Sequence, residues 1–406
     1  MNILMLCTKF SLAENDPWLT NELADAFRQK GHAVSVIHLD WWATPGRPTQ
    51  RLTTSAGTQV VSLAPVLMKS PIPLVSKMLK WGLSSFSALK VLRQQLNQAP
   101  VDLVIGFSPA VTMALPILWQ ARQRKTRSFF VLWDFFPFHQ QQIGLISSPL
   151  IFRFSKWLES LLLRKFHHIG CMSNANIDYL KSHYTLGADQ QLHIVPIWGK
   201  EAALPVICRE AVREQYGLPV TPPIVVFGGQ LVQGRGLEDL LCMAEEAARQ
   251  GLQTHFLIMG SGVLEGMVTD YLAKGHSNLT WIARVPRDEY LKVAQACDVA
   301  LVCTVRDVDV PSFPSKTIDY LRLGLPIVAS VEKSTDYGAF LMENGVGISV
   351  EAGQPKQVLA EIQQLLSCDN TLRDMKQRGP ECFSQHFEVG RVASQIIEQV
   401  RGTVQK

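Results

Sequence analysis

Along nearly its whole length the chain alternates short apolar runs, rich in β-branched residues, with longer stretches of helical periodicity. Parallel sheets built from strand–helix–strand units produce this alternation, because each strand is buried on both faces and each crossover needs a helix. The pattern excludes all-helical and all-β folds, and a hydrophobic content of 47% excludes a disordered chain. We therefore predict an α/β fold.

The apolar runs give definite positions for the elements. In the first half we expect strands at Ile3–Cys7, Ala33–His38, Gln59–Leu63, Asp102–Phe107, Ser128–Trp133, His168–Met172 and Leu192–Val195. In the second half we expect them at Ile224–Phe227, His255–Met259, Leu279–Ala283, Val299–Cys303, Pro326–Ser330 and Val346–Val350. Helices are predicted between the strands, and the last residues are predicted to form two helices, one ending near Phe387 and one at Gly390–Arg401.

The length of 406 residues suits two domains of similar size. The alternation pauses near Pro196 and restarts at Ile224, after a polar segment that contains several prolines. We place the boundary near residue 200, which gives domains at 1–199 and 200–375, followed by helices at 376–406.

The charge is unevenly distributed. The formal net charge of +4 is too small to imply nucleic acid as a partner, but residues 1–199 carry 19 Lys and Arg against 10 Asp and Glu. This basic half suggests an anionic partner such as a membrane surface. The helical stretches Leu74–Asn97 and Pro149–His168 mix Lys and Arg with Trp, Phe and Leu, as interfacial helices do, although an apolar stripe that faces the core would look similar. Together they predict peripheral membrane contact.

The eight cysteines are scattered, without a C-x-x-C pair or a histidine at zinc-ligand spacing. They are therefore expected to be reduced thiols of a cytoplasmic protein. The first apolar run, Met1–Cys7, is shorter than a signal peptide and is predicted to be a strand. No run reaches the length that a bilayer crossing needs, since charged residues, the acid Glu159 among them, break the nearest one at Pro149–Phe166.

A glycine-rich loop follows the strand Ile224–Phe227 and precedes a helix that starts at Leu237. Gly229 and Gly236 allow the backbone to approach an anion closely, and Arg235 adds a guanidinium fork suited to a diphosphate. The loop matches neither G-x-G-x-x-G nor the P-loop pattern. Judged by glycine content alone, an ordinary flexible loop is an equally good interpretation of this segment.

A second candidate segment runs from Asp309 to Ser330. Pro314 favours an extended approach to a helix, Ser315 is a good N-cap, and Lys316 stands in the first helical turn. A lysine is electrostatically unfavourable there unless an anion neutralises it. Asp319, one turn further along the same face, could accept hydrogen bonds from sugar hydroxyls or form an ordinary ion pair with Lys316.

The run Phe313–Ser330, the strand before it at Asp298–Val302 and the segment Gly345–Ile348 resemble the donor-binding half of retaining glycosyltransferase family 4. In the N-terminal half the resemblance rests on pattern and on Gly31–Val34. It implies the GT-B fold, in which two Rossmann-like domains face each other across the active site. Residues 1–199 would then bind the acceptor, 200–375 would bind the nucleotide-sugar donor, and the helices at 376–406 would pack back on the first domain.

By position, Gln230 and Arg235 occupy places where the family holds the donor diphosphate with an arginine and a lysine, so one charge is missing. Asp319 falls on the second acid of the family's Glu-x7-Glu pair, while Pro311 stands at the first. This resembles a branch of the family with a Pro-Ser-Lys segment, and it leaves Asp307 or Asp309 as substitutes for the missing acid. The donor-binding residues that the resemblance implies are Gly229, Gln230, Arg235, Gly236, Arg284, Val285, Ser315, Lys316 and Asp319.

Asp134 ends the buried strand Ser128–Trp133, and His139 follows in the next loop. Ligands of open α/β sheets bind beyond the carboxyl ends of the strands. Since the family often has an Asp or His facing the acceptor here, Asp134, then His139, are candidate catalytic residues alongside Asp319. Lys9 and Phe10, at the tip of the first strand, are predicted on the same acceptor side. Core packing of the aromatics and a surface histidine are the alternatives.

Asp307-Val308-Asp309 matches the D-x-D pattern of metal-dependent GT-A enzymes, but such triplets are common by chance. GT-B enzymes replace the metal with basic side chains and helix N-termini, so we expect neither a metal nor a cofactor.

The resemblance predicts a glycosyltransferase that moves a sugar from a UDP- or GDP-sugar to a hydroxyl of a lipid-linked or polysaccharide acceptor, with retention. The predicted setting is the biosynthesis of a cell-envelope polysaccharide or lipopolysaccharide, in the cytoplasm or peripherally on the inner face of the plasma membrane. Alternatives are a non-catalytic binding partner with the same fold, which the missing first acid favours, and a GT-B epimerase.

Overall fold

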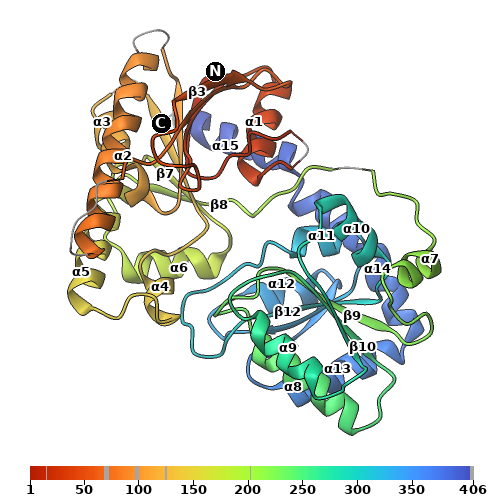
Figure 1. Ribbon diagram of the computed structural model, residues 1–406. Helices are drawn as coiled ribbons and strands as arrows, with labels where there is room; N and C mark the ends of the chain where they lie inside the picture. Colours follow the sequence, from red (N-terminus) through yellow and green to blue (C-terminus); the bar gives the residue numbers. More distant parts are fainter. Residues whose placement is uncertain (15, 68–72, 97–99, 124–125, 202, 403–406) are drawn as a thin grey trace. The chain divides into compact units, whose positions relative to one another are not determined.

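The computed structural model describes residues 1–406 except 15, 68–72, 97–99, 124–125, 202 and 403–406, with the side chains of 73–79 and 96 also outside the description (Figure 1). The chain divides into two compact units. Unit 1 comprises Met1–Lys200 and Glu388–Lys406, and unit 2 comprises Glu201–Phe387. No helix formed by the described residues is both long enough and apolar enough to cross a membrane.

The described residues of unit 1 form an eight-stranded sheet in the order β3-β4-β2-β1-β5-β6-β7-β8. All neighbouring strands are parallel except β3 and β4. The strands are β1 (Asn2–Cys7), β2 (Ala33–Leu39), β3 (Gln50–Thr53), β4 (Gln59–Leu63), β5 (Leu103–Phe107), β6 (Arg127–Leu132), β7 (His168–Cys171) and β8 (Gln191–Ile194).

The helices of unit 1 cover this sheet. They are α1 (Leu19–Gln29), α2 (Pro73–Leu96), the short 3-10 helix η1 (Ala110–Met113), α3 (Ala114–Gln120), α4 (Phe138–Gln142), α5 (Pro149–Leu163), α6 (Asn174–His183) and α15 (Val389–Gly402). The C-terminal α15 packs beside α1 (Figure 1), and both bury their apolar faces against β1 through residues such as Phe27, Ile396 and Met5. The 3-10 helix η1 contacts α2, α3 and α5.

Unit 2 contains a parallel sheet in the order β11-β10-β9-β12-β13-β14. Its strands are β9 (Ile224–Gly228), β10 (His255–Met259), β11 (Leu279–Ile282), β12 (Val299–Cys303), β13 (Ile327–Val331) and β14 (Gly347–Glu351). Its helices are α7 (Arg209–Gln215), α8 (Leu237–Arg249), α9 (Glu265–Ala273), α10 (Arg287–Gln295), α11 (Thr317–Arg322), α12 (Tyr337–Glu343), α13 (Pro355–Leu366) and α14 (Asp369–His386). Residues of α8, α9 and α13 form the core with the strands.

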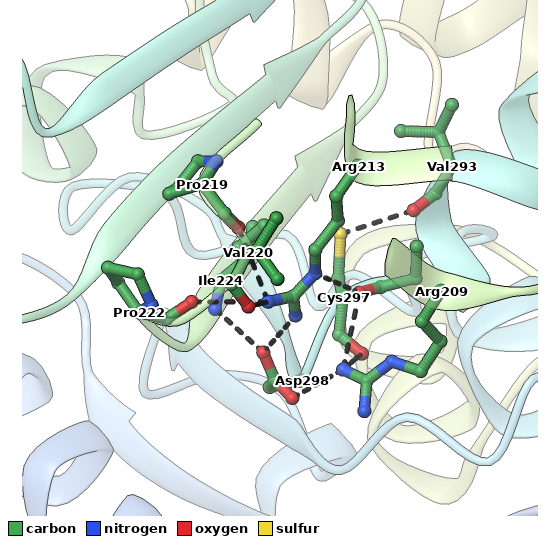
Figure 2. A network of polar contacts seen from close by, with 10 residues as sticks. Arg209, Arg213, Pro219, Val220, Pro222, Ile224, Val293, Cys297 and Asp298 are labelled. Carbon is green, nitrogen blue, oxygen red and sulfur yellow. Dashed lines mark hydrogen bonds and ion pairs between the residues drawn. The ribbon is translucent and has the colours of Figure 1, made fainter. Parts of the chain in front are cut away.

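Asp298, just before β12, ties α7 to the sheet of unit 2 (Figure 2). Its carboxylate accepts hydrogen bonds from Arg209 at 2.6 Å, from Arg213 at 2.7 Å and from the backbone N–H of Ile224 at 2.8 Å. Burial acts to raise the pKa of Asp298, but these donors outweigh it and hold the pKa below its usual value. The network anchors the polar segment before β9, in which the sequence did not predict α7.

The two sheets, parallel except for the β3–β4 pair, confirm the predicted α/β architecture, and each predicted strand is present within a residue or two of its expected ends. The predicted C-terminal segment needs a correction. Residues 376–387 belong to unit 2, because α14 packs on α11 and α13 and Phe387 contacts Phe313 and Phe340. Of the C-terminal helices, α15 packs with unit 1.

Candidate functional site

The loop after β9 opens the candidate site of unit 2. Gly236, at the N-cap of α8, has a φ of 61°, and a Cβ there would lie 2.6 Å from the carbonyl oxygen of Thr304 and 2.7 Å from Cys303. Only glycine fits this backbone and this approach to the end of β12. Gly229 also has a positive φ, at 142°, and both Gln230 and Arg235 are exposed on the loop. The predicted glycines therefore have a defined role in bringing the β9 loop beside β12.

Lys316 lies under this loop. Its Nζ atom is buried, lies 3.7 Å from the centroid of the Phe227 ring and has no hydrogen-bond partner within the described part of the chain. A Cβ built on Gly229 would be 3.7 Å from the same nitrogen. Burial, helped by the nearby charge of Arg235, lowers the pKa of Lys316 to about 7.

This arrangement suits an anion. The ammonium group loses its hydration on burial, and among the described residues the Phe227 ring is the contact that replaces part of it; the group also stands beside a second cation. An anion bound between the β9 loop and Lys316 would neutralise the pair and restore the protonated form of the amine. The structure thus brings together Gly229, Arg235 and Lys316, which the sequence predicted as one group.

Ser315 does not cap a helix as predicted. Helix α11 begins at Thr317 with Lys316 at the N-cap position, and no side chain caps it. The N–H groups of Thr317 and Ile318 donate to the carbonyl oxygens of Pro314 and Ser315 instead. Because this tight turn already uses them, these two N–H groups are not available to an anion.

Asp319 forms an ion pair, but with partners other than the predicted Lys316. Arg287 donates to both carboxylate oxygens of Asp319, at 2.7 and 3.2 Å, and Arg322 lies 3.8 Å from one of them. A bidentate pair of this kind occupies the oxygens that were predicted to receive sugar hydroxyls. The carboxylate therefore holds α10 to α11, and Arg287 is a residue that sequence reasoning missed.

Arg284 and Val285 follow β11, two strands away from β9 in the sheet order. Arg284 is exposed, and its backbone N–H donates to the hydroxyl of Ser261 at 3.1 Å. Val285 is partly exposed. Among the described residues, neither Arg284 nor Val285 forms a hydrogen bond with the Lys316 ammonium group.

In unit 1, Asp134 and His139 lie together beyond the carboxyl end of β6, as the sequence predicted. The backbone N–H groups of Trp133 and Asp134 donate to the hydroxyl of Ser108, at 3.0 and 3.1 Å. One oxygen of Asp134 accepts from Gln140 at 3.0 Å, and the other lies 4.0 Å from Nδ1 of His139. His139 and Gln140 belong to the short helix α4 rather than to a loop. Half-exposed and held by its neighbours, Asp134 is available to a ligand.

Glu159 holds in place the segment that follows Ser108. Its buried carboxylate accepts hydrogen bonds from the N–H groups of Ala110, at 2.7 Å, and Val111, at 2.9 Å, which open η1 after Ser108. Burial raises the pKa of Glu159 to about 8, although the two N–H donors act in the opposite direction. Sequence reasoning missed Glu159 and treated it as a break in an apolar run. The feature of the sequence that could have singled out Glu159 is that it is the only acid in α5.

The two predicted residues at the tip of β1 have different environments. Lys9 is exposed, and its Nζ lies 5.4 Å from the centroid of the Trp18 ring. Phe10 is buried in the core of unit 1, where its ring packs near His38, so the prediction that it faces a ligand is wrong. The hydrophobic effect favours burial of this apolar ring in the core over its exposure to water at the edge of the sheet.

The two acids of the D-x-D triplet, Asp307 and Asp309, are both exposed. Within the described residues no group of three or more His, Cys, Asp and Glu side chains is arranged to hold a metal ion.

Two family models match the chain. Residues 209–381 match the model described as Glycosyl transferases group 1, and residues 18–198 match the Glycosyl transferase 4-like domain. Together with the two parallel-sheet units, these matches identify the protein as a glycosyltransferase with the GT-B fold.

The chain is similar to known proteins over almost all of its length. It is 22% identical over 400 residues to WcaI of Escherichia coli K12, a glycosyl transferase named for colanic acid biosynthesis, covering 94% of this chain and 95% of WcaI. Among solved structures, sucrose-phosphate synthase from Thermosynechococcus elongatus superposes with a TM-score of 0.75 at 17% identity, covering 100% of this chain and 99% of the synthase. HepE from Anabaena, solved in complex with UDP-glucose, superposes with a TM-score of 0.66 at 14% identity, covering 99% of this chain and 100% of HepE.

Proposed function

We propose that the protein transfers a sugar from a nucleotide-diphosphate sugar, UDP- or GDP-linked, to a hydroxyl of a lipid-linked or polysaccharide acceptor, with retention at the anomeric carbon. Two comparisons support this proposal. WcaI is named for the biosynthesis of a polysaccharide, and HepE was solved with UDP-glucose. The retaining chemistry rests on the resemblance to glycosyltransferase family 4.

The observation that carries the proposal is the buried ammonium group of Lys316, which has no hydrogen-bond partner among the described residues and lies beside Gly229 and the charge of Arg235. In a retaining transfer the departing nucleoside diphosphate gains negative charge as the glycosidic bond breaks. Fixed cations at that point stabilise the developing charge without reorganising. Lys316 and Arg235 are proposed to do this, with Gly229 and Gln230 letting the backbone approach the diphosphate and Gly236 fixing the loop.

Asp134 and His139 are proposed to act on the acceptor side, with Lys9 beyond the end of β1, two strands away from β6 in the sheet. The half-exposed carboxylate of Asp134 is placed to orient an acceptor hydroxyl, and Ser108 and Gln140 hold it in position. No metal is proposed, because the two cations supply the positive potential that a metal provides in other transferases.

The acceptor is proposed to be assembled on the cytoplasmic side of a membrane, in the biosynthesis of a surface polysaccharide. The basic excess of residues 1–199, 19 cationic against 10 acidic residues, supports a peripheral association with an anionic membrane surface.

The proposed donor site is tested by titrating UDP and GDP into the full-length protein in a calorimeter. Wild type should bind one of them with a dissociation constant between micromolar and millimolar values, and Lys316→Ala should weaken binding at least tenfold. Lys274→Ala, which removes an exposed cation of unit 2 paired with Glu245, is the control and should bind as wild type does. Binding that is equal in wild type and Lys316→Ala would place the nucleotide elsewhere.

A further inference from the structure

Helix α5 is apolar on more than the face that it buries: Leu162 and Leu163 lie in the core, yet large apolar residues also lie on the outside. Its buried positions include Ser155 and Glu159, whereas Leu150, Phe154 and Trp157 are exposed, with 77%, 47% and 59% of their surfaces accessible. These three apolar residues follow each other at i, i+4 and i+7, so they form one stripe along the helix. The rings of Phe154 and Trp157 lie 5.9 Å apart, which makes the stripe continuous.

The charges on the same side of the helix are all positive. Arg153 in α5, and Arg164 and Lys165 in the turn just after it, are exposed and continue the spacing of the apolar stripe. We define the outer face of α5 as Leu150, Arg153, Phe154, Trp157, Arg164 and Lys165. The only acid in the helix, Glu159, points the other way and binds the N–H groups of Ala110 and Val111. The fold therefore removes the one negative charge from this surface.

Such a face is costly in water. Exposed apolar side chains at this density are unusual on a soluble surface and mark a contact with a partner. Aromatic and leucine side chains interleaved with arginine and lysine match the headgroup region of a bilayer with anionic lipids, where rings enter the acyl boundary and cations meet phosphates. The complementarity of charge favours an anionic lipid surface over a protein partner, whose interface core would be depleted of charge.

In α2, the other helix predicted to lie on a membrane, the described side chains expose one large apolar residue, Phe86, with 59% of its surface accessible. Trp81, in α2, packs edge-on against Phe136 with ring centroids 6.1 Å apart and is partly buried. Trp81 thus contributes to the packing of unit 1. Residues 73–79 of the same helix lie outside the described side chains.

We propose that the outer face of α5 is the surface on which the protein docks to an anionic lipid bilayer, with Leu150, Phe154 and Trp157 entering the headgroup layer and Arg153, Arg164 and Lys165 binding lipid phosphates. This proposal rests on the proposed function, because a lipid-linked acceptor is presented at such a surface. Salt should weaken the cationic contribution, while the inserted side chains should keep part of the binding at high ionic strength.

Co-sedimentation of the full-length protein with vesicles tests it. Wild type should bind vesicles of phosphatidylglycerol and phosphatidylethanolamine at low salt, and bind neutral phosphatidylcholine vesicles at least tenfold more weakly. Phe154→Ser/Trp157→Ser should lose at least tenfold in affinity and lose all binding at high salt. Arg164→Gln/Lys165→Gln should lose affinity at low salt and lose most of the salt dependence.

Matched controls come from unit 2. Val263→Ser/Met342→Ser removes two exposed apolar side chains, and Lys274→Gln/Lys333→Gln removes two exposed cations. Both should bind vesicles as wild type does. If the controls lose as much binding as the α5 variants, or if wild type does not bind anionic vesicles, the proposal is overturned.

Two further measurements separate this proposal from its rivals. Calorimetric titration with UDP and GDP on the same preparations should give equal affinities for wild type and the α5 variants. Nucleotide binding without vesicle binding overturns the docking surface alone, and vesicle binding that depends on α5, without nucleotide binding, supports the surface and overturns the donor site. Sedimentation velocity covers the protein-partner case: if wild type self-associates through α5 and ignores vesicles, the face is a protein interface.

Discussion

Arg287, at the start of α10, donates to both carboxylate oxygens of Asp319 in α11, 32 residues further along the chain. The pair joins two crossover helices at the same edge of the unit 2 sheet, close to the loop that contains Lys316. Because Asp319 is buried and Arg287 is partly exposed, the pair is a structural contact that depends on both partners.

The first prediction concerns this pair. Asp319→Asn and Arg287→Ala should each lower the free energy of unfolding by about 2 kcal/mol, less than the loss of one partner of a fully buried ion pair because Arg287 is partly exposed. The double variant should lose much less than the sum, with a coupling energy of about 1 kcal/mol or more. Urea unfolding of the four proteins measures this cycle. Additive losses, together with a fall in turnover for Asp319→Asn alone, would instead assign the carboxylate to the substrate.

The second prediction concerns turnover. Lys316→Ala and Arg235→Ala should each lower the rate of sugar transfer by about two to three orders of magnitude, as the loss of one fixed partner of a developing charge does. Steady-state kinetics with the donor that the titrations identify provides the measurement. Lys274→Ala should retain the wild-type rate. Near-normal turnover in both site variants, with intact folding, would contradict the assignment of the donor site.

The third prediction follows from the lowered pKa of Lys316. This pKa is about 7, and a bound diphosphate would raise it, so donor binding takes up a proton above neutral pH. Donor affinity should therefore fall as pH rises from about 7 to 8.5, by up to about tenfold per pH unit. Calorimetry of nucleotide-sugar binding across this range measures the effect.

Lys316→Arg provides the control for this titration, because a guanidinium stays protonated throughout the range. Its donor affinity should be nearly independent of pH. The same slope in wild type and in Lys316→Arg would assign the pH dependence to another group.

Much of the fold could be predicted because strands that are buried on both faces leave continuous apolar runs. β3 was missed, since Gln50–Thr53 is polar and mostly exposed and pairs antiparallel at the sheet edge through the turn at Gly57. Helix α14 was assigned to the wrong unit for its last residues, because the aromatic contacts of Phe387 are not visible in a helical pattern.

The site was predictable where its residues are near in sequence. The Pro-Ser-Lys segment singled out Lys316, and the β9 loop singled out Gly229 and Arg235. Glu159 could not be paired with Ala110, because 49 residues separate them and nothing local distinguishes a carboxylate that turns inward. The mixture of basic and apolar residues singled out α5 as a candidate interfacial helix, but which of its side chains are exposed could not be predicted, since an apolar stripe that faces the core looks the same in the sequence.

The fourth prediction is that transfer does not require a divalent metal. Lys316 and Arg235 supply fixed positive charge at the proposed diphosphate position, so a metal ion adds no needed interaction there. Turnover should be unchanged after dialysis against EDTA, and Asp307→Asn/Asp309→Asn should retain activity. Complete loss of turnover in EDTA that manganese restores would contradict the metal-free chemistry.

The fifth prediction concerns acid stability and two buried histidines of unit 1. His38 contacts the hydroxyl of Ser62, and His168 lies 3.0 Å from His193; burial lowers the pKa of His38 and of His168 to about 4. A histidine kept neutral in the fold binds a proton more readily when unfolded, so stability falls as pH drops from about 6.5 toward 4. For His38 alone the loss should reach about 2 kcal/mol at pH 5.

Urea unfolding of wild type and His38→Asn at pH 7.5, 6 and 5 measures this loss, since asparagine can keep a hydrogen bond to Ser62 but does not titrate. The variant should be less stable than wild type at pH 7.5, because the imidazole also packs near Phe10, and the difference should shrink by about 2 kcal/mol at pH 5. A stability difference between wild type and His38→Asn that stays constant with pH would mean that His38 takes up its proton equally in both states.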